Sequence, residues 1–304
     1  MRMTNIRLTP PLRRWVEHPC ALVAVIGLLL SGGAVLRPVP AQAQTATLEV
    51  MDWNIHHGLD TSGANNLERV VTWIVNVNPH VVSLNEVEKE NGYNDDADEP
   101  AVLESALESR TGVPWYGCFA QRDGAATGQG NLILSRLPIQ SCAPQLLSAT
   151  RSVARATLSV GNVVVTVFST HLDDASASTR TVQIAELASL SATAPAERIL
   201  MGDFNAGPSA AELEPLRTGW DDAWAVAVAG GTAVSYPGNT AGNTRNGRID
   251  YIWRSKSGAR LALQSAQVYD TGTISDHRPV SATYAVGGVL PAPRAPANVR
   301  VVVR

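Results

Sequence analysis

Short apolar runs alternate with longer stretches of helical periodicity through most of the chain. Runs rich in Val, Ile, Leu, Thr and aromatic residues, bounded by Gly, Asn, Asp or Pro, are typical of β-strands. They predict strands over residues 48–54, 81–84, 132–135, 154–160, 163–170, 199–202, 249–253 and 279–284. The helical stretches predict helices over residues 67–75, 101–109, 179–190 and 210–216, with Asn66 and Asp98 as N-caps of the first two.

The same pattern contains a hairpin. Gly161-Asn162 separates two Val-rich runs and is typical of a tight turn between antiparallel strands. Hairpins mixed with strand–helix units favour a layered α/β or α+β domain over a purely parallel sheet. Residues 45–286 are enough for one large core and are predicted as a single domain, followed by a Pro/Ala-rich tail over residues 287–304.

The first 44 residues have a different pattern. Four arginines lie between residues 2 and 14, an apolar run follows over residues 21–30, and Ala41-Gln42-Ala43 is a small-x-small site. This order predicts a signal peptide cleaved near Ala43/Gln44, and hence a secreted or periplasmic protein. The apolar run is shorter than the roughly 20 residues of a spanning helix, although an uncleaved anchor is the alternative. Arg13-Arg14 leaves the export route open.

Removal of this segment changes the charge balance. The full chain has 24 basic and 27 acidic residues, a net charge of −3. Residues 1–44 contain five arginines and one glutamate, so the mature chain has 19 basic and 26 acidic residues, a net charge of −7. A protein of that sign has no broad basic surface for duplex nucleic acid. A polyanionic substrate would need bridging metal ions or a local basic groove. The candidate groove residues, each with a solvated surface position as the alternative, are Arg122, Arg151, Arg155, Arg180, Arg245 and Arg248.

Two of the three cysteines lie outside the predicted signal peptide. Cys118 and Cys142 each lie in or beside a predicted strand, with a Gly-rich turn between them. An even number of cysteines in an exported chain favours a disulfide between them, with two buried free thiols as the alternative.

Polar residues recur where the predicted strands end. They are Asn54, His56, Asn85, Glu86, His171, Asp203, Asn205, Asp250, Asp276 and His277. Strand-end loops allow a rigid sheet to hold several polar groups around one cleft. Carboxylates and amides suit a hard cation, and histidines beside acids suit proton transfer and stabilisation of anionic charge. The sequence has no structural-zinc spacing, no GxxxxGK[ST] loop and no Gly-x-Ser-x-Gly elbow, which favours metal-assisted attack by water.

The order of these segments resembles the endonuclease/exonuclease/phosphatase superfamily, which includes DNase I-like nucleases, inositol polyphosphate 5-phosphatases and bacterial sphingomyelinases. The resemblance covers residues 48–284. Its most specific segments are Gly-Asp-Phe-Asn at residues 202–205, Arg-Ile-Asp-Tyr-Ile at residues 248–252, Ser-Asp-His-Arg-Pro-Val at residues 275–280 and Gly-Asn-Leu-Ile-Leu-Ser-Arg at residues 130–136. Trp-Asn-Ile-His-His-Gly at residues 53–58 is similar to a bacterial branch of metal-dependent hydrolases.

The resemblance implies a four-layer α/β/β/α sandwich, in which two mixed β-sheets pack face to face with helices outside. It also implies a divalent cation, Mg²⁺ or Mn²⁺ with Ca²⁺ as a further candidate. Glu86 would be its main ligand, helped by Asn54 and Asp276. Asp203 would deprotonate the attacking water and Asn205 would place it.

The resemblance implies two histidine roles as well. His277, paired with Asp250, would hold the phosphoryl oxygens, and His171 would contact the phosphate or assist the leaving group. The substrate-binding candidates are His56, Arg122, Asn131 and Arg248. His56 stands where some members of the superfamily have an acid, so the number and identity of the metal ions are open.

These features predict an exported phosphoester hydrolase of the phosphodiesterase or nuclease type. The alternatives are a lipid or inositol phosphate phosphodiesterase or phosphatase on the same fold, and a non-catalytic binding module. The expected substrates are nucleic acid, a phospholipid headgroup or a small phosphodiester. No protein partner is implied, and a monomer is expected.

Overall fold

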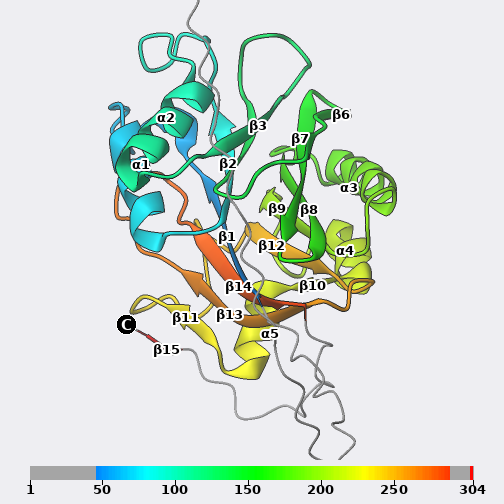
Figure 1. Cartoon of the computed structure of the whole chain (residues 1–304). Helices are drawn as coiled ribbons and strands as arrows, with labels where there is room; N and C mark the ends of the chain where they lie inside the picture. The colour runs from blue at the N-terminus through cyan, green and yellow to red at the C-terminus, as the bar shows by residue number, and fades with distance from the viewer. Residues whose placement is uncertain (1–45, 288–301, 304) are drawn as a thin grey trace, which may run out of the picture. The chain divides into compact units, whose positions relative to one another are not determined.

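The computed structural model describes residues 46–287 and 302–303 (Figure 1). The predicted signal peptide of residues 1–44 and most of the predicted tail of residues 287–304 lie outside the described residues. Among the helices of the described ranges, none combines the length and the apolar character needed to cross a membrane.

Two mixed β-sheets form the centre of the molecule (Figure 1). The first sheet has the strand order β15 (Val302–Val303), β11 (Ala233–Ser235), β13 (Leu261–Val268), β14 (Val280–Val286), β1 (Ala46–Asn54), β2 (Val81–Val87), β4 (Gly130–Ser135) and β3 (Tyr116–Gln121). The second has the order β10 (Trp220–Asp222), β12 (Asp250–Ser255), β9 (Arg198–Asp203), β8 (Val163–His171), β7 (Arg151–Val160) and β5 (Ser141–Cys142), and β6 (Gln145–Leu147) also pairs with β7. The central pairs β1–β2 and β8–β9 are parallel.

Three apolar clusters separate four layers. One cluster lies between α1 (Leu67–Val77), α2 (Glu99–Thr111) and the outer face of the first sheet. A second lies between α3 (Ala177–Ala192), the η2–α4 segment (Ala211–Leu213 and Glu214–Gly219) and the outer face of the second sheet. The largest fills the space between the sheets, and α5 (Ala223–Gly230) adds Trp224 to it. The predicted four-layer sandwich is therefore confirmed.

The alternation of side chains along each strand determines which residues enter the layer between the sheets. In β1, Leu48 and Val50 face this layer, whereas Met51 and Trp53 face α1 and α2. Because side chains alternate with a period of two, Asn54 continues the inward face to the end of the strand. The same rule applies to β9, where Ile199 and Met201 precede Asp203.

The inward face turns polar at one end of every central strand. The buried polar residues there are Asn54, Ser83, Asn85, Asn131, Ser152, Ser169, His171, Asp203 and Asp250. They also join the two sheets, since the Ser83 and Ser169 hydroxyls are 2.7 Å apart and Asn85 Nδ2 donates to the Thr170 carbonyl at 3.0 Å. One end of the inter-sheet layer is thus apolar and the other is a hydrogen-bonded network.

All eight predicted strands and the first three predicted helices are present, while residues 210–216 form the η2 turn and the start of α4. The Asp98 cap is confirmed, because its Oδ1 accepts from Ala101 N at 3.1 Å. Asn66 precedes α1 but makes no capping bond; its amide donates instead to the carbonyl of Ile274. The predicted hairpin is confirmed, with Val160 paired to Val163 across Gly161-Asn162.

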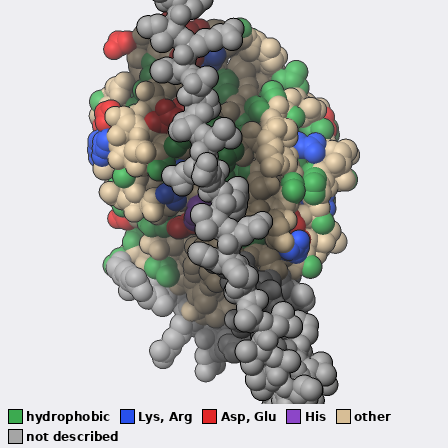
Figure 2. All heavy atoms as spheres, viewed as in Figure 1, with side chains coloured by type: hydrophobic (Ala, Val, Ile, Leu, Met, Phe, Trp, Pro, Cys, Tyr) green, Lys and Arg blue, Asp and Glu red, His purple; other side chains and the backbone are tan. Residues whose placement is uncertain are grey.

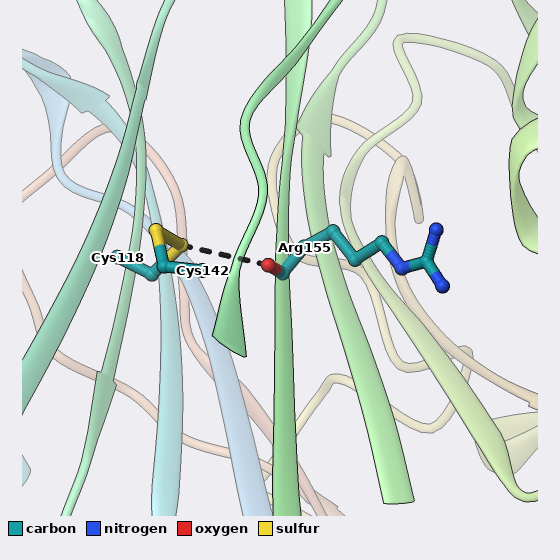
Figure 3. The surroundings of a disulfide bond; sticks show 3 residues. All are labelled: Cys118, Cys142 and Arg155. Atoms are coloured by element: carbon teal, nitrogen blue, oxygen red, sulfur yellow. Dashed lines mark hydrogen bonds between the residues drawn. A yellow bond between two sulfur atoms is a disulfide. The ribbon is translucent and has the colours of Figure 1, made fainter. Parts of the chain in front are cut away.

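The predicted disulfide is confirmed, but it does not join neighbouring strands of one sheet (Figure 3). Cys118 lies on β3, the edge strand of the first sheet, and Cys142 lies on β5, the edge strand of the second. Their Cα atoms are 5.5 Å apart, and the Cys118 sulfur lies 3.6 Å from the Arg155 carbonyl oxygen of β7. The bond therefore holds the two sheets together along one edge.

Candidate active site

An open cleft of about 390 Å³ lies where the polar ends of the central strands meet. It is lined by His57, Glu86, Arg122, Gln129, Arg151, His171, Asp174, Asp203, Asn205 and Arg245. In Figure 2, basic and acidic side chains and one histidine lie close together near the middle of the face shown. Of the residues predicted for the site, the cleft brings together Glu86, Arg122, His171, Asp203 and Asn205.

Asp203, the last residue of β9, is held from several sides. Its Oδ1 accepts from Asn205 N at 2.8 Å and its Oδ2 from Asn54 Nδ2 at 3.2 Å, while its own backbone N donates to Asn85 Oδ1 at 3.1 Å. Burial and the nearby charge of Asp250 raise the pKa of Asp203 to about 7. A carboxylate with such a pKa can take a proton from water at neutral pH.

His277 and Asp250 form a buried pair next to Asp203. His277 Nδ1 lies 2.9 Å from Asp250 Oδ2, and its Nε2 lies 3.8 Å from Asp203 Oδ2. Burial acts to lower the pKa of His277, but Asp250, Asp203 and Asp276 together raise it to about 10. The ring is therefore an imidazolium at neutral pH. Neither His277 nor Asp250 lines the cleft, so both lie behind Asp203.

His171, at the end of β8, has the opposite charge state. Burial and the charge of Arg151 hold the pKa of His171 well below its usual range, so the ring is neutral. Asn205 Nδ2 lies 3.0 Å from His171 Nε2 and also donates to the Leu172 carbonyl at 3.1 Å. Since Nδ2 is a donor, Nε2 accepts and the ring proton is on Nδ1. The neutral His171 thus lines the cleft, whereas the cationic His277 lies behind Asp203.

Glu86 occupies an irregular point at the end of β2. The pairing of β2 with β4 shifts register between Leu84 and Val87, and Glu86 has a left-handed backbone with φ 55°. Its Oε1 accepts from Asn54 Nδ2 at 2.8 Å, and its Oε2 lies 3.2 Å from His57 Nε2. One amide therefore lies between the carboxylates of Glu86 and Asp203.

These carboxylates have the chemistry that a hard divalent cation requires. Glu86 and Asp203 present oxygen atoms to the same cleft, and oxygen ligands suit Mg²⁺ or Mn²⁺. Ligand atoms of Asp203, Asp250 and His277 also lie within 4.8 Å of one another. Since His277 is protonated and bonded to Asp250, we assign those three to proton and charge control rather than to metal binding. Asp276 forms an ion pair with Arg245 at 2.5 Å.

Three predicted substrate-binding residues do not line the cleft. Arg248 is buried, pairs with Asp222 at 2.5 Å and lies over the Tyr251 ring at 4.8 Å. Asn131 Oδ1 accepts from Asn85 Nδ2 at 2.9 Å, so it supports the residue that holds the backbone of Asp203. The His56 backbone N donates to Asn54 Oδ1 at 3.0 Å.

Two of the candidate groove arginines, Arg151 and Arg245, also line the cleft, whereas its lining residues His57, Gln129 and Asp174 were not in the predicted set. The position of Arg151 near the site follows from the strand register that the sequence predicts. The hairpin at Gly161-Asn162 sets an antiparallel register in which Val153 pairs with Thr170, so Arg151 lies beside the residues that follow His171. Counting back from the turn would have placed this arginine at the site.

The fold and the site together define a class of protein. A two-sheet sandwich whose inner layer ends in carboxylates, amides and histidines is suited to hydrolysis by an activated water beside an anionic substrate. A family model, the Endonuclease/Exonuclease/phosphatase family, matches residues 53–277. The chain belongs to this family and is a hydrolase that acts on phosphoester bonds. Enzymes with this fold depend on divalent metal ions.

Solved structures share the fold. The endonuclease/exonuclease/phosphatase from Beutenbergia cavernae DSM 12333 is 24% identical, with a TM-score of 0.64 over 80% of this chain and 72% of that chain. The humanized D. rerio TDP2 is 20% identical, with a TM-score of 0.59 over 78% and 98%. The Bacteroides thetaiotaomicron mannosyl-6-phosphatase is 17% identical, with a TM-score of 0.60 over 77% and 98%. No curated protein sequence matches the chain.

Proposed function

We propose that the chain is an exported, divalent-metal-dependent phosphodiesterase that uses water as the nucleophile. The observation that carries this proposal is the convergence of Asp203, Asn205 and His171 in one cleft, with Glu86 on its wall and the Asp250–His277 pair behind it. These residues come from distant parts of the sequence and from both sheets.

The residues divide the chemistry between them. Asp203 accepts the proton of the attacking water, for which a pKa of about 7 is well matched. His277, held as an imidazolium by Asp250, offsets the negative charge that develops on the phosphoryl oxygens. Asn205 and the neutral His171 orient the water or a phosphoryl oxygen by hydrogen bonds.

Glu86, supported by Asn54, is the residue that would hold the metal ion, Mg²⁺ or Mn²⁺. When bound, such an ion neutralises phosphate charge and polarises the phosphorus centre. Its charge would also reduce repulsion between the substrate and the acidic residues of the cleft.

A phosphodiester is the proposed substrate because it carries less negative charge than a phosphomonoester and is repelled less by Glu86 and Asp203. A phosphomonoester is the second candidate, favoured by the shared fold of the mannosyl-6-phosphatase. Phospholipids, which are phosphodiesters, and inositol phosphates, which are phosphomonoesters, belong in the same substrate panel.

The test compares bis-p-nitrophenyl phosphate and p-nitrophenyl phosphate with Mg²⁺, Mn²⁺, Ca²⁺ or EDTA. We expect metal-dependent turnover with a preference for the diester, and loss of turnover in Asp203→Asn. Asp95→Asn, a carboxyl-to-amide change at an exposed position, is the matched control. Absence of hydrolysis with every metal and substrate would instead support a binding module.

Export of the protein from the cytosol is supported by the disulfide and can be tested separately from catalysis. The Cys118–Cys142 bond suits an oxidising compartment outside the cytosol. We expect the protein outside the cytoplasm, with an N-terminus close to Gln44. Recovery of an intact chain from the cytosol, beginning at Met1, would contradict export without affecting the assignment of the hydrolase.

A further inference from the structure

The first sheet ends in a short strand that the C-terminal tail supplies. Residues 302–303 form β15, which pairs in parallel with β11 at one edge of this sheet (Figure 1). Val302 lies opposite Val234, and Val303 lies opposite Ser235. The proposed hydrolysis takes place in the cleft at the strand ends, and none of its steps uses this pairing.

Other edges of the two sheets have features that hinder pairing with another molecule. β3, the opposite edge of the first sheet, is joined by the disulfide to β5, an edge of the second. β10, at the other end of the second sheet, includes the charged residues Asp221 and Asp222. Charged edges and covered edges are features by which proteins prevent their sheets from joining those of other molecules.

β11 has no such protection of its own. Its three residues, Ala-Val-Ser, carry no charge and include no proline. Apart from β15, the only described strand beside β11 is β13. An edge strand presents a row of unpaired backbone N–H and C=O groups to any strand that reaches it. Without β15, β11 would offer such a row on the side away from β13.

The tail is long enough to reach β11 from the end of β14 in the same molecule. In the sheet, β15 lies three strand positions from β14, and Val302 is level with Ser281, near the start of β14. The strand spacing and the rise per residue then place Val302 about 22 Å from Val286, where β14 ends. Residues 287–301 connect these two points, and a chain of that length extends to roughly 50 Å. One molecule can therefore cover its own edge.

The tail also has a composition that suits this edge. Residues 287–304 contain three arginines and no acidic residue, whereas residues 45–286 have 16 basic and 26 acidic residues, a net charge of −10. These opposite charges favour contact between the tail and the rest of the chain. The Val-Arg-Val-Val-Val-Arg run at residues 299–304 is rich in β-branched residues, which favour strands. A tethered strand also has an effective concentration on the order of millimolar, far above that of a second molecule in dilute solution.

We propose that the C-terminal tail is a built-in cover for the β11 edge. By pairing with β11 within one molecule, β15 prevents the β11 strands of two copies from pairing with each other. Two uncovered β11 strands would pair about a two-fold axis, because each offers the same backbone groups to the other. This inference concerns the assembly state of the protein and does not depend on the proposed hydrolysis.

Hydrogen exchange tests the pairing directly. Val302→Pro/Val303→Pro removes both backbone N–H groups of β15, and Ala292→Pro/Ala295→Pro is the matched control in the proline-rich part of the tail. We expect roughly tenfold faster exchange of the β11 amides in the first variant, and wild-type exchange in the control. Equal exchange of the β11 amides in all three proteins would show that the tail leaves the edge uncovered, which overturns the inference.

Gel filtration with light scattering tests the consequence for assembly. The whole protein should be a monomer, and deletion of residues 299–304 should give a dimer whose fraction rises with concentration. A synthetic peptide of residues 298–304 should return the truncated protein to a monomer, whereas the same peptide with Val302→Pro/Val303→Pro should not. A truncated protein that stays monomeric at millimolar concentration overturns the inference. A dimer of the whole protein that the deletion abolishes also overturns it, since the tail would then pair between molecules.

Discussion

The two ends of the layer between the sheets are built by the same strands with opposite chemistry. At one end the inward residues include Val50, Val167 and Met201, all fully buried. At the other end the same strand faces carry Asn54, His171 and Asp203. Apolar burial stabilises the fold by roughly 25 cal/mol per Å², whereas burial of a carboxylate disfavours its charged form.

The raised pKa values show the difference between the ends. Asp52 is fully buried and its carboxylate has no hydrogen-bond partner among the described residues; desolvation and the charge of Asp250 raise its pKa well above its usual range. The pKa of Asp203 is raised to about 7. The polar end therefore opposes folding, and the apolar end supplies the stability that holds it together. Substitutions at the two ends should accordingly affect different properties.

The largest effect is expected from His277→Gln at the polar end. Loss of the imidazolium should reduce kcat by about 10²- to 10⁴-fold, because a positioned charged group then no longer acts in the transition state. The free energy of unfolding should fall as well, because glutamine leaves Asp250 buried without its cationic partner, but the loss of kcat is what distinguishes this variant from a change at the apolar end. Steady-state kinetics on bis-p-nitrophenyl phosphate and urea denaturation check both parts; near wild-type kcat would show that His277 has no role in turnover.

Leu158→Ala is the matching change at the apolar end. Leu158 on β7 is fully buried between the sheets, and its truncation should lower the free energy of unfolding by about 2–5 kcal/mol. The kinetic constants of the folded variant should stay close to wild type when measured well below its Tm. A fall in kcat comparable to that of His277→Gln would mean that the two ends are not independent.

Removal of the disulfide tests the edge at which the sheets are joined. The cysteines are 24 positions apart, and opening a loop of this length should cost about 3 kcal/mol. Cys118→Ser/Cys142→Ser should therefore have a lower Tm by calorimetry. Reduced wild-type protein is the control, and an unchanged Tm in both would indicate that packing alone holds this edge.

The smallest change in the free energy of unfolding is expected at Glu99, which is linked through Glu88 to the cleft residue His57. Glu99 Oε2 accepts from Glu88 N at 2.8 Å, and Glu88 Oε1 lies 2.6 Å from His57 Nδ1. Burial raises the pKa of Glu99 from 4.5 to about 7. The folded state thus binds more protons than the unfolded state, and this contribution to stability, complete below pH 4.5, is lost as the pH rises through about 7.

Glu99→Gln should remove that dependence. We expect the variant to gain on the order of 1 kcal/mol over wild type at pH 8, and no gain at pH 4, because glutamine stays neutral at both. Urea denaturation across pH 4 to 9 measures the difference. A constant difference at every pH would show that the glutamate is already ionised in the folded protein.

Much of the fold was readable from the sequence because its central strands are strongly apolar and end in polar motifs. The elements that were missed have weaker patterns: β13 contains Gln264, Ser265 and Gln267, and α5 is an alternation of Ala and Val that does not indicate a helix. Both depend on contacts with the rest of the inter-sheet cluster.

The site was predicted less completely than the fold. Asp203, Asn205 and His171 follow from strand-end motifs, but Arg248 was expected at the substrate and is instead paired with Asp222, 26 positions away in the chain. A single sequence gives no sign of such a pairing. Whether an arginine reaches a cleft or a distant carboxylate is decided by tertiary packing, which periodicity does not encode.

The irregularity at the end of β2 has a consequence for the direction in which Glu86, the proposed metal ligand, points. Val82 and Leu84 face the outer helices, and a regular strand would send the side chain at position 86 the same way, into an apolar layer. One extra residue between Leu84 and Val87, with Glu86 in a left-handed conformation, turns this carboxylate over to the opposite side of the sheet. An idealised β2 would pair better with β4 and would turn the proposed metal ligand away from the cleft.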